Sequence, residues 1–155
     1  MYLYLVQHGD AVSEAIDPQK PLSPRGRQTV EDLARACSRF GVSTREILHS
    51  GKPRAAQSAE ILGEALGIRP RVSAGLDPLD PVKPFAAECE VWEEPKVIVG
   101  HLPFLERLTA LLVAGREEPP VIAFQRGGMV CLEKRGPSDW RILWTDFPDQ
   151  PKKGS

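Results

Sequence analysis

The sequence lacks the marks of secreted, membrane-spanning and nucleic-acid-binding chains. Its three cysteines are far apart and form no C-x-x-C pair, so neither a disulfide framework nor a zinc ribbon is expected. No apolar run approaches the roughly 20 residues of a membrane span, and the N-terminus has no basic stretch typical of a signal peptide. Because 20 Lys+Arg balance 21 Asp+Glu, no broad basic surface for nucleic acid is indicated. We expect a cytoplasmic protein without membrane or nucleic-acid partners.

Several well-known catalytic loops are also absent. The sequence contains neither G-x-x-x-x-G-K-[ST] nor G-x-G-x-x-G, so nucleotide-binding loops are not supported. A Cys-x5-Arg phosphatase loop is excluded because Ser43, Pro95 and Pro137 stand six positions after the cysteines.

The composition is that of an ordinary globular domain, with 41% hydrophobic and 26% charged residues in a chain of 155. This length predicts one domain, residues 1–148, followed by a flexible tail, residues 149–155.

Segments typical of strands alternate with segments typical of helices. Apolar runs predict strands at Tyr2–Val6, Glu46–His49, Arg71–Leu76, Lys96–Val99, Val121–Phe124, Met129–Lys134 and Trp140–Thr145. Helical periodicity and end signals predict helices from Ser23-Pro24 to Gly41, over Lys52–Gly67, over Val82–Trp92 and directly after Pro103. This alternation indicates an α/β fold: a three-layer α/β/α sandwich with a mostly parallel, mixed sheet whose last strands are antiparallel.

Two histidines occupy matching positions in this pattern. His8 follows the Tyr2–Val6 strand, His101 follows the Lys96–Val99 strand, and each has a glycine beside it. Ligands of parallel sheets bind beyond the carboxyl ends of the strands, so both imidazoles are expected to project into one site. The alternative is a structural histidine at the end of each strand.

Arg54 lies in a third segment that passes from a strand into a helix. In the first turn of a helix, free N–H groups and the helix dipole attract anions. The guanidinium is a fork of donors that matches phosphate oxygens. Alone, Arg54 reads as a solvated surface charge, but together with the two histidines it predicts a phosphate site.

Four ordered motifs resemble those of the histidine phosphatase superfamily, also called phosphoglycerate mutase-like. Val6–Ala11 (VQHGDA) is similar to its Arg-His-Gly-(Asp/Glu)-Ala signature, and Pro21–Arg27 to its Leu-(Thr/Ser)-x-x-Gly segment. Ser50–Ala59 matches Ser-x-x-x-Arg-Ala-x-Gln-Thr-Ala with one Ser for Thr, and Val97–Pro103 matches strand-Gly-His-x-Pro. The short chain and a turn at Phe124–Met129 are most like the SixA branch, the phosphohistidine phosphatases.

The resemblance implies a phosphoglycerate mutase-like fold and a hydrolase without metal or other cofactor. His8 corresponds to the nucleophile, and Arg54 and His101 to the groups that hold the phosphoryl oxygens. Gln7, Gly9, Arg54 and His101 are the implied phosphate-binding residues, so phosphate or sulfate is an expected ligand. The implied partner is a protein carrying phosphohistidine or a small phosphorylated substrate. We expect a monomer.

Gln7 is the largest departure from the family pattern, which has arginine immediately before the nucleophile. Glutamine offers an amide donor but no charge, and a lost charge-assisted contact costs roughly 1.5–3 kcal/mol. Arg25 or Lys52 could restore the charge. Reduced activity therefore stays an alternative, as does a phosphate- or phosphoprotein-binding module without catalysis.

The general acid is left open by the sequence. Asp77 and Asp80 lie in the loop after the third predicted strand, and Asp10 follows the His8 motif; each is also a typical turn-forming aspartate. A phosphatase of small phosphate esters needs such an acid. A phosphohistidine phosphatase needs it less, because protonated imidazole leaves readily.

Overall fold

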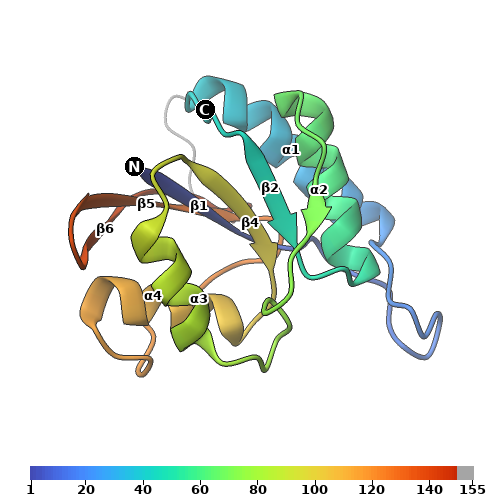
Figure 1. Cartoon of the computed structure of the whole chain (residues 1–155). Coiled ribbons are helices and arrows are strands. Elements are labelled where there is room, and N and C mark those ends of the chain that lie inside the picture. The colour runs from blue at the N-terminus through green and yellow to red at the C-terminus, as the bar shows by residue number, and fades with distance from the viewer. Residues whose placement is uncertain (150–155) are drawn as a thin grey trace.

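Residues 1–149 of the chain are described by the computed structural model. Figure 1 shows one twisted sheet with a pair of helices on each face. The elements, in chain order, are β1 (Tyr2–Gln7), α1 (Pro24–Arg39), β2 (Glu46–His49), α2 (Pro53–Leu66), β3 (Arg71–Val72), α3 (Val82–Val91), β4 (Lys96–Gly100), α4 (Phe104–Ala114), β5 (Met129–Gly136) and β6 (Asp139–Asp146).

The sheet has the strand order β3-β2-β4-β1-β5-β6. Strands β1 to β4 run parallel to one another, whereas β5 pairs antiparallel with both β1 and β6. The predicted α/β/α sandwich with a mostly parallel, mixed sheet is therefore confirmed. The arrowheads of β2 and β4 point to one edge, the carboxyl edge of the sheet (Figure 1).

The core lies on both faces of the sheet because successive side chains of a strand point to opposite sides. Leu3 and Leu5 of β1 pack with residues of α3 and α4. Tyr4 and Val6 pack with residues of α1 and α2. Burial on both faces explains why the central parallel strands are almost continuously apolar in sequence.

The predicted helix signals act as expected at the start of α1 and at the end of α2. The Ser23 hydroxyl caps α1 by accepting a hydrogen bond from the Gly26 amide at 2.9 Å, with Pro24 as the first helical residue. Gly67 ends α2 in the left-handed conformation, with φ of 71°. The first helix ends at Arg39, two residues before the predicted Gly41.

Two of the predicted strands are wrong in whole or in part. The strand predicted at Arg71–Leu76 is limited to Arg71–Val72, and the chain turns away through Gly75, whose φ is 87°. Val121–Phe124 forms no strand; the Phe124 amide instead donates to the Glu106 carboxylate at 3.0 Å. The prolines directly before it, Pro119 and Pro120, have no N–H to donate to a neighbouring strand.

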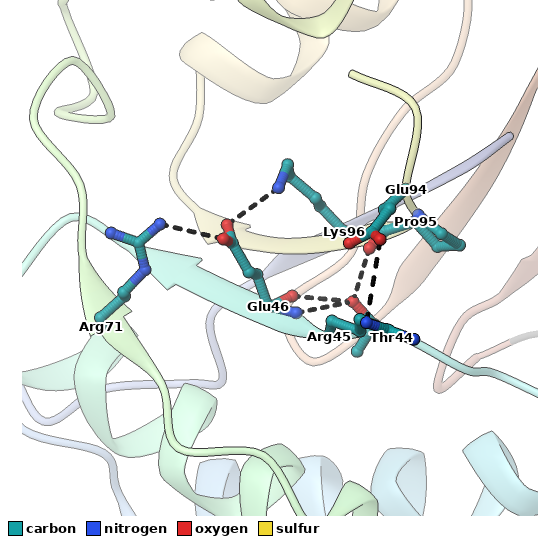
Figure 2. Close-up of polar contacts among 7 residues, drawn as sticks. All are labelled: Thr44, Arg45, Glu46, Arg71, Glu94, Pro95 and Lys96. Atoms are coloured by element: carbon teal, nitrogen blue, oxygen red, sulfur yellow. Dashed lines mark hydrogen bonds and ion pairs between the residues drawn. The ribbon is translucent and has the colours of Figure 1, made fainter.

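A network of charges joins three strands at their amino edge (Figure 2). The Glu46 carboxylate lies between the ammonium of Lys96, at 2.9 Å, and the guanidinium of Arg71, at 3.1 Å. The Thr44 hydroxyl adds hydrogen bonds to the backbone carbonyls of Glu46 and Pro95, at 2.8 and 2.9 Å. These contacts tie β3, β2 and β4 together where the strands begin.

The three cysteines are free thiols and all are buried. Burial raises the pKa of Cys37 to about 11 and that of Cys131 to about 12, so these thiols are unreactive at neutral pH. Within residues 1–149 no helix is both long and apolar enough to cross a bilayer. The predicted tail over 149–155 lies outside the described residues apart from Asp149.

Candidate active site

His8 and His101 lie side by side at the carboxyl edge of the sheet. Strands β1 and β4 are parallel neighbours with Gln7 opposite Gly100, so the next residue of each chain segment leaves the sheet at the same level. The His8 amide donates to the Gly100 carbonyl at 3.1 Å. The two imidazole centroids are 4.9 Å apart, with the rings tilted by 52°. The structure thus brings together the two histidines that the sequence pattern singles out.

The hydrogen bond of His8 sets its tautomer. Its Nδ1 lies 2.7 Å from the Gly9 carbonyl oxygen. A carbonyl only accepts, so Nδ1 carries the hydrogen and Nε2 keeps a free lone pair. The Nε2 of His101 lies 2.6 Å from the Ser50 hydroxyl, which fixes the second ring. The Nδ1 of His101 is buried and has no partner among the described residues.

Both imidazoles are neutral at physiological pH. Burial, together with the positive charges of Arg54, Arg126 and Lys20, lowers the pKa of His8 to about 4, although the Gly9 hydrogen bond acts in the opposite direction. Burial, His8 and nearby cations that include Arg54 lower the pKa of His101 to about 3. The site therefore combines two uncharged rings with a positive surrounding field.

Arg54 is the second residue of α2, directly after Pro53, and is half-buried. The helix is fixed against the His8 loop because the Ser58 hydroxyl accepts from the Gly9 amide at 3.0 Å and donates to the Arg54 carbonyl at 2.8 Å. The charge of Arg54 acts on both imidazoles. The predicted trio of His8, Arg54 and His101 therefore gathers at one edge of the sheet.

Two glycines of the motifs allow the start of α1 to approach the His8 loop. A Cβ on Gly26 would lie 2.0 Å from the Asp10 carbonyl oxygen, and a Cβ on Gly9 would lie 2.7 Å from the Gly26 carbonyl oxygen. Any other residue at either position would force backbone against backbone. The Gln57 side chain adds a link by accepting from the Leu22 amide at 2.7 Å.

Gln7 is buried, with 7% of its surface exposed, and its Oε1 has no hydrogen-bond partner among residues 1–149. The sequence offered Arg25 and Lys52 as replacements for the missing family arginine. Lys52 contributes to the positive field at His101. Arg25 instead lines a cavity of about 350 Å³ beside the site, together with Asp10 and Arg126.

The three candidate acids differ in their surroundings. Asp10 has both carboxylate oxygens engaged, Oδ1 by Arg126 at 2.9 Å and Oδ2 by the Ser23 hydroxyl at 2.8 Å. Asp80 accepts from the Asp77 amide at 2.9 Å, which is the turn role expected of such residues, and Asp77 is exposed. The assignment of an acid stays a prediction.

Sequence reasoning missed three contributors to the site. Ser50, which contacts His101, stands in the Ser-x-x-x-Arg motif, so a signal for it was present. Lys20 and Arg126 come from loops, and their charges act on His8. Arg126 stands in the Phe124–Met129 turn, whose resemblance to the SixA branch was noted without a role for the arginine, whereas no local pattern distinguishes Lys20 from a solvated surface residue. Within residues 1–149 no group of three His, Cys, Asp or Glu side chains is arranged to hold a metal ion.

Comparison with known proteins assigns the family. The profile of the histidine phosphatase superfamily (branch 1) matches residues 3–81, and the chain belongs to this superfamily. An uncharacterized protein of Picosynechococcus sp. (strain ATCC 27264 / PCC 7002 / PR-6) is 35% identical over 124 residues, covering 75% of each chain.

Solved structures identify the fold as phosphoglycerate mutase-like, with SixA proteins among the similar ones. The protein histidine phosphatase SixA complexed with tungstate superimposes with a TM-score of 0.85 at 23% identity, over 96% of this chain and 97% of that chain. A mycobacterial glucosyl-3-phosphoglycerate phosphatase complexed with VO3 gives 0.72 at 18% identity, over 92% and 98%. A phosphoserine phosphatase from Entamoeba histolytica gives 0.73 at 13% identity, over 96% and 98%. Superfamily membership supports a phosphatase.

Proposed function

We propose that the protein is a metal-independent phosphatase that forms a phosphohistidine intermediate at His8 and removes phosphate from phosphohistidine on a protein. The observation that carries the proposal is the His8 side chain. It is neutral, its Nδ1 donates to the Gly9 carbonyl, and its ring lies 4.9 Å from that of His101. A neutral imidazole with a free Nε2 is a competent nucleophile at pH 7.

In the first step, the Nε2 lone pair of His8 attacks phosphorus. The bond from phosphorus to the leaving group breaks, and its electron pair departs with that group. The phosphorylated ring becomes cationic, and its Nδ1–H stays bonded to the Gly9 carbonyl, 2.7 Å away. Arg54 and His101 hold the phosphoryl oxygens and stabilise the charge that develops in the transition state.

In the second step, water hydrolyses the intermediate. The water oxygen bonds to phosphorus, the P–Nε2 bond breaks, and its electron pair returns to His8. The protons of that water stay on the phosphate, which leaves as dihydrogen phosphate, and the original neutral tautomer of His8 is restored. Every group in this cycle belongs to the chain, the substrate or water.

The substrate assignment rests on the leaving group. Both oxygens of the Asp10 carboxylate are engaged by other side chains, and Asp80 is occupied within its own turn. A phosphohistidine leaves as imidazole, which needs little help from an acid, whereas the alkoxide of a phosphate ester needs a proton. SixA, a protein histidine phosphatase, shares this fold with tungstate bound. We expect the protein to act as a cytoplasmic monomer.

The test is incubation with a protein phosphorylated on histidine, followed by rapid denaturation and mass spectrometry. Release of phosphate together with a phosphorylated peptide containing His8 is the expected result. The His8→Ala variant should show neither, whereas His49→Ala, which removes the third histidine, should retain both. Turnover without label on His8 would overturn the proposal.

The second candidate is a phosphatase of small phosphate esters. It is favoured by the fold shared with a glucosyl-3-phosphoglycerate phosphatase and a phosphoserine phosphatase. Faster hydrolysis of p-nitrophenyl phosphate than of phosphohistidine, lost in Asp77→Asn or Asp10→Asn, would favour it. Tight phosphate binding without turnover of either substrate would instead indicate a phosphate- or phosphoprotein-binding module whose catalysis is lost because Gln7 replaces the family arginine.

A further inference from the structure

The turn before β5 is fastened to the backbone of the proposed nucleophile. The Gly127 amide donates to the carbonyl oxygens of Gln7 and His8, at 2.9 and 3.2 Å. Gly127 has a φ of 73°, and a Cβ there would lie 2.5 Å from the Thr29 side chain of α1. The turn is therefore held on both sides, and the residue before Gly127 has a fixed position beside His8.

That residue is Arg126, and its side chain is oriented by an ion pair. Its Nη1 donates to Oδ1 of Asp10 at 2.9 Å, and Oδ2 of Asp10 accepts from the Ser23 hydroxyl at 2.8 Å. Among the described residues Asp10 is the only hydrogen-bond partner of the Arg126 guanidinium, and the side chain is 62% exposed. Since arginine has five N–H donors, four remain available to a ligand.

Arg126 also borders open space next to the site. It lines the cavity of about 350 Å³ whose wall also includes Asp10, two residues beyond His8 in the chain. The positive charge of Arg126 lowers the pKa of His8. Among the cations that do so, only Arg54 has a larger effect. The turn that carries Arg126 is bonded to the His8 carbonyl, and its guanidinium is bonded to Asp10, two residues beyond His8, so Arg126 lies at the same edge of the sheet as His8.

We propose that Arg126 supplies the cationic phosphate contact that Gln7 does not provide, which makes it a substrate-binding residue. The inference rests on the proposed function. The observation behind it is that Gln7 is neutral and that the turn bonded to the Gln7 carbonyl carries Arg126. Lys20 also acts on His8, but its ammonium has no hydrogen-bond partner among residues 1–149 and is a single point charge. The Arg126 fork is pre-oriented and suits two phosphate oxygens.

The test measures binding of inorganic phosphate by calorimetry and needs no turnover. Arg126→Gln should weaken binding about tenfold, the effect of one charge-assisted contact at a partly exposed position. Arg126→Lys keeps the charge and should recover part of the loss. Arg135→Gln is the matched control, because this substitution also removes one positive charge from an exposed arginine that is paired with a carboxylate. Arg135 is paired with Glu133, which lies opposite the start of β1 and away from the site. This variant should bind phosphate as the parent does.

Combination with Gln7→Arg tests whether the two positions serve one anion. If they do, Arg126→Gln should weaken binding less when position 7 already carries a charge. Parent-like binding by Arg126→Gln, or an equal loss in Arg126→Lys, would overturn the inference. If Arg126→Gln weakens phosphate binding equally with glutamine and with arginine at position 7, Arg126 does not replace the contact that the family arginine makes. The proposed function fails separately, if no phosphorylated His8 is found.

Discussion

At the amino edge of the parallel strands charged groups are paired, whereas at the carboxyl edge polar atoms are left without partners. Glu46 contacts Lys96 and Arg71 on its two oxygens. The buried side-chain atoms without a partner among the described residues, Gln7 Oε1 and His101 Nδ1, both lie at the other edge.

This difference separates the part of the sheet that stabilises the fold from the part that binds. An unsatisfied buried polar atom costs about 1–3 kcal/mol. Such a cost is tolerated where a ligand later supplies the missing contact. The amino edge, by contrast, satisfies its charges within the chain, so substitutions there are expected to change stability and leave activity unchanged.

The largest effect on activity is expected from a substitution of Arg54 at the carboxyl edge. Arg54→Gln should lower kcat/KM about 10²–10³-fold, as removal of a preorganised transition-state contact does. The free energy of unfolding should hardly change, because no hydrogen bond of its guanidinium is present within residues 1–149. The kcat/KM of Arg54→Lys should lie between those of the parent and Arg54→Gln. Steady-state kinetics with phosphohistidine measures the effect, and parent-like kinetics would remove Arg54 from the site.

The neutral histidines should make stability depend on pH. Their pKa values in the folded protein are about 4 for His8 and about 3 for His101, against an unfolded value of about 6.5. Above pH 6.5 neither state binds protons at these sites, so this contribution is complete. As the pH falls, the unfolded state binds protons first and the free energy of unfolding drops, by on the order of 2 kcal/mol for each histidine at pH 4.5.

Urea unfolding at pH 7 and pH 4.5 measures this loss. His101→Gln removes one titrating group and should lose less stability between the two pH values than the parent. Equal losses in parent and variant would show that His101 titrates normally.

Gln7→Arg should sharpen the contrast by adding a charge at the carboxyl edge. We expect phosphate affinity or turnover to rise about tenfold, the value of one charge-assisted contact. Calorimetry with inorganic phosphate and kinetics with phosphohistidine provide the two readouts. If both stay the same or fall, the site has been rebuilt around glutamine.

The smallest effect is expected at the amino edge. Glu46→Gln should lower the free energy of unfolding by about 1 kcal/mol, less at high salt, and leave kcat/KM unchanged. The control is Glu94→Gln, since Glu94 lies 3.9 Å from Arg45 and both side chains are well exposed. Thermal unfolding should barely detect that change. A loss of activity in Glu46→Gln would contradict the division between the two edges.

Much of the fold follows from local sequence signals. Apolar runs located β1, β2 and β4, and Ser23-Pro24 marked the start of α1. The predictions failed where tertiary contacts compete with β propensity. Val121–Phe124 is rich in strand-forming residues, but its last amide is taken by Glu106 of α4. The predicted third strand stops early because Gly75 adopts a conformation with φ of 87°.

The site was predictable in its centre and not at its rim. His8, Arg54 and His101 each follow a strand of the parallel sheet, so the topology alone brings them to one edge. Arg126 reaches the same edge through the antiparallel β5, whose pairing with β1 is a long-range contact. Its position depends on the fit of Gly127 against Thr29, which sequence spacing does not encode.

The most direct test of the account is a crystal structure of the protein soaked with tungstate, a tetrahedral mimic of phosphate. We expect one anion in contact with His8 Nε2, the Arg54 guanidinium and the His101 ring, with Arg126 turned toward it. An anion bound elsewhere, or these three side chains left empty at saturating tungstate, would contradict the central claim that they form one phosphoryl site.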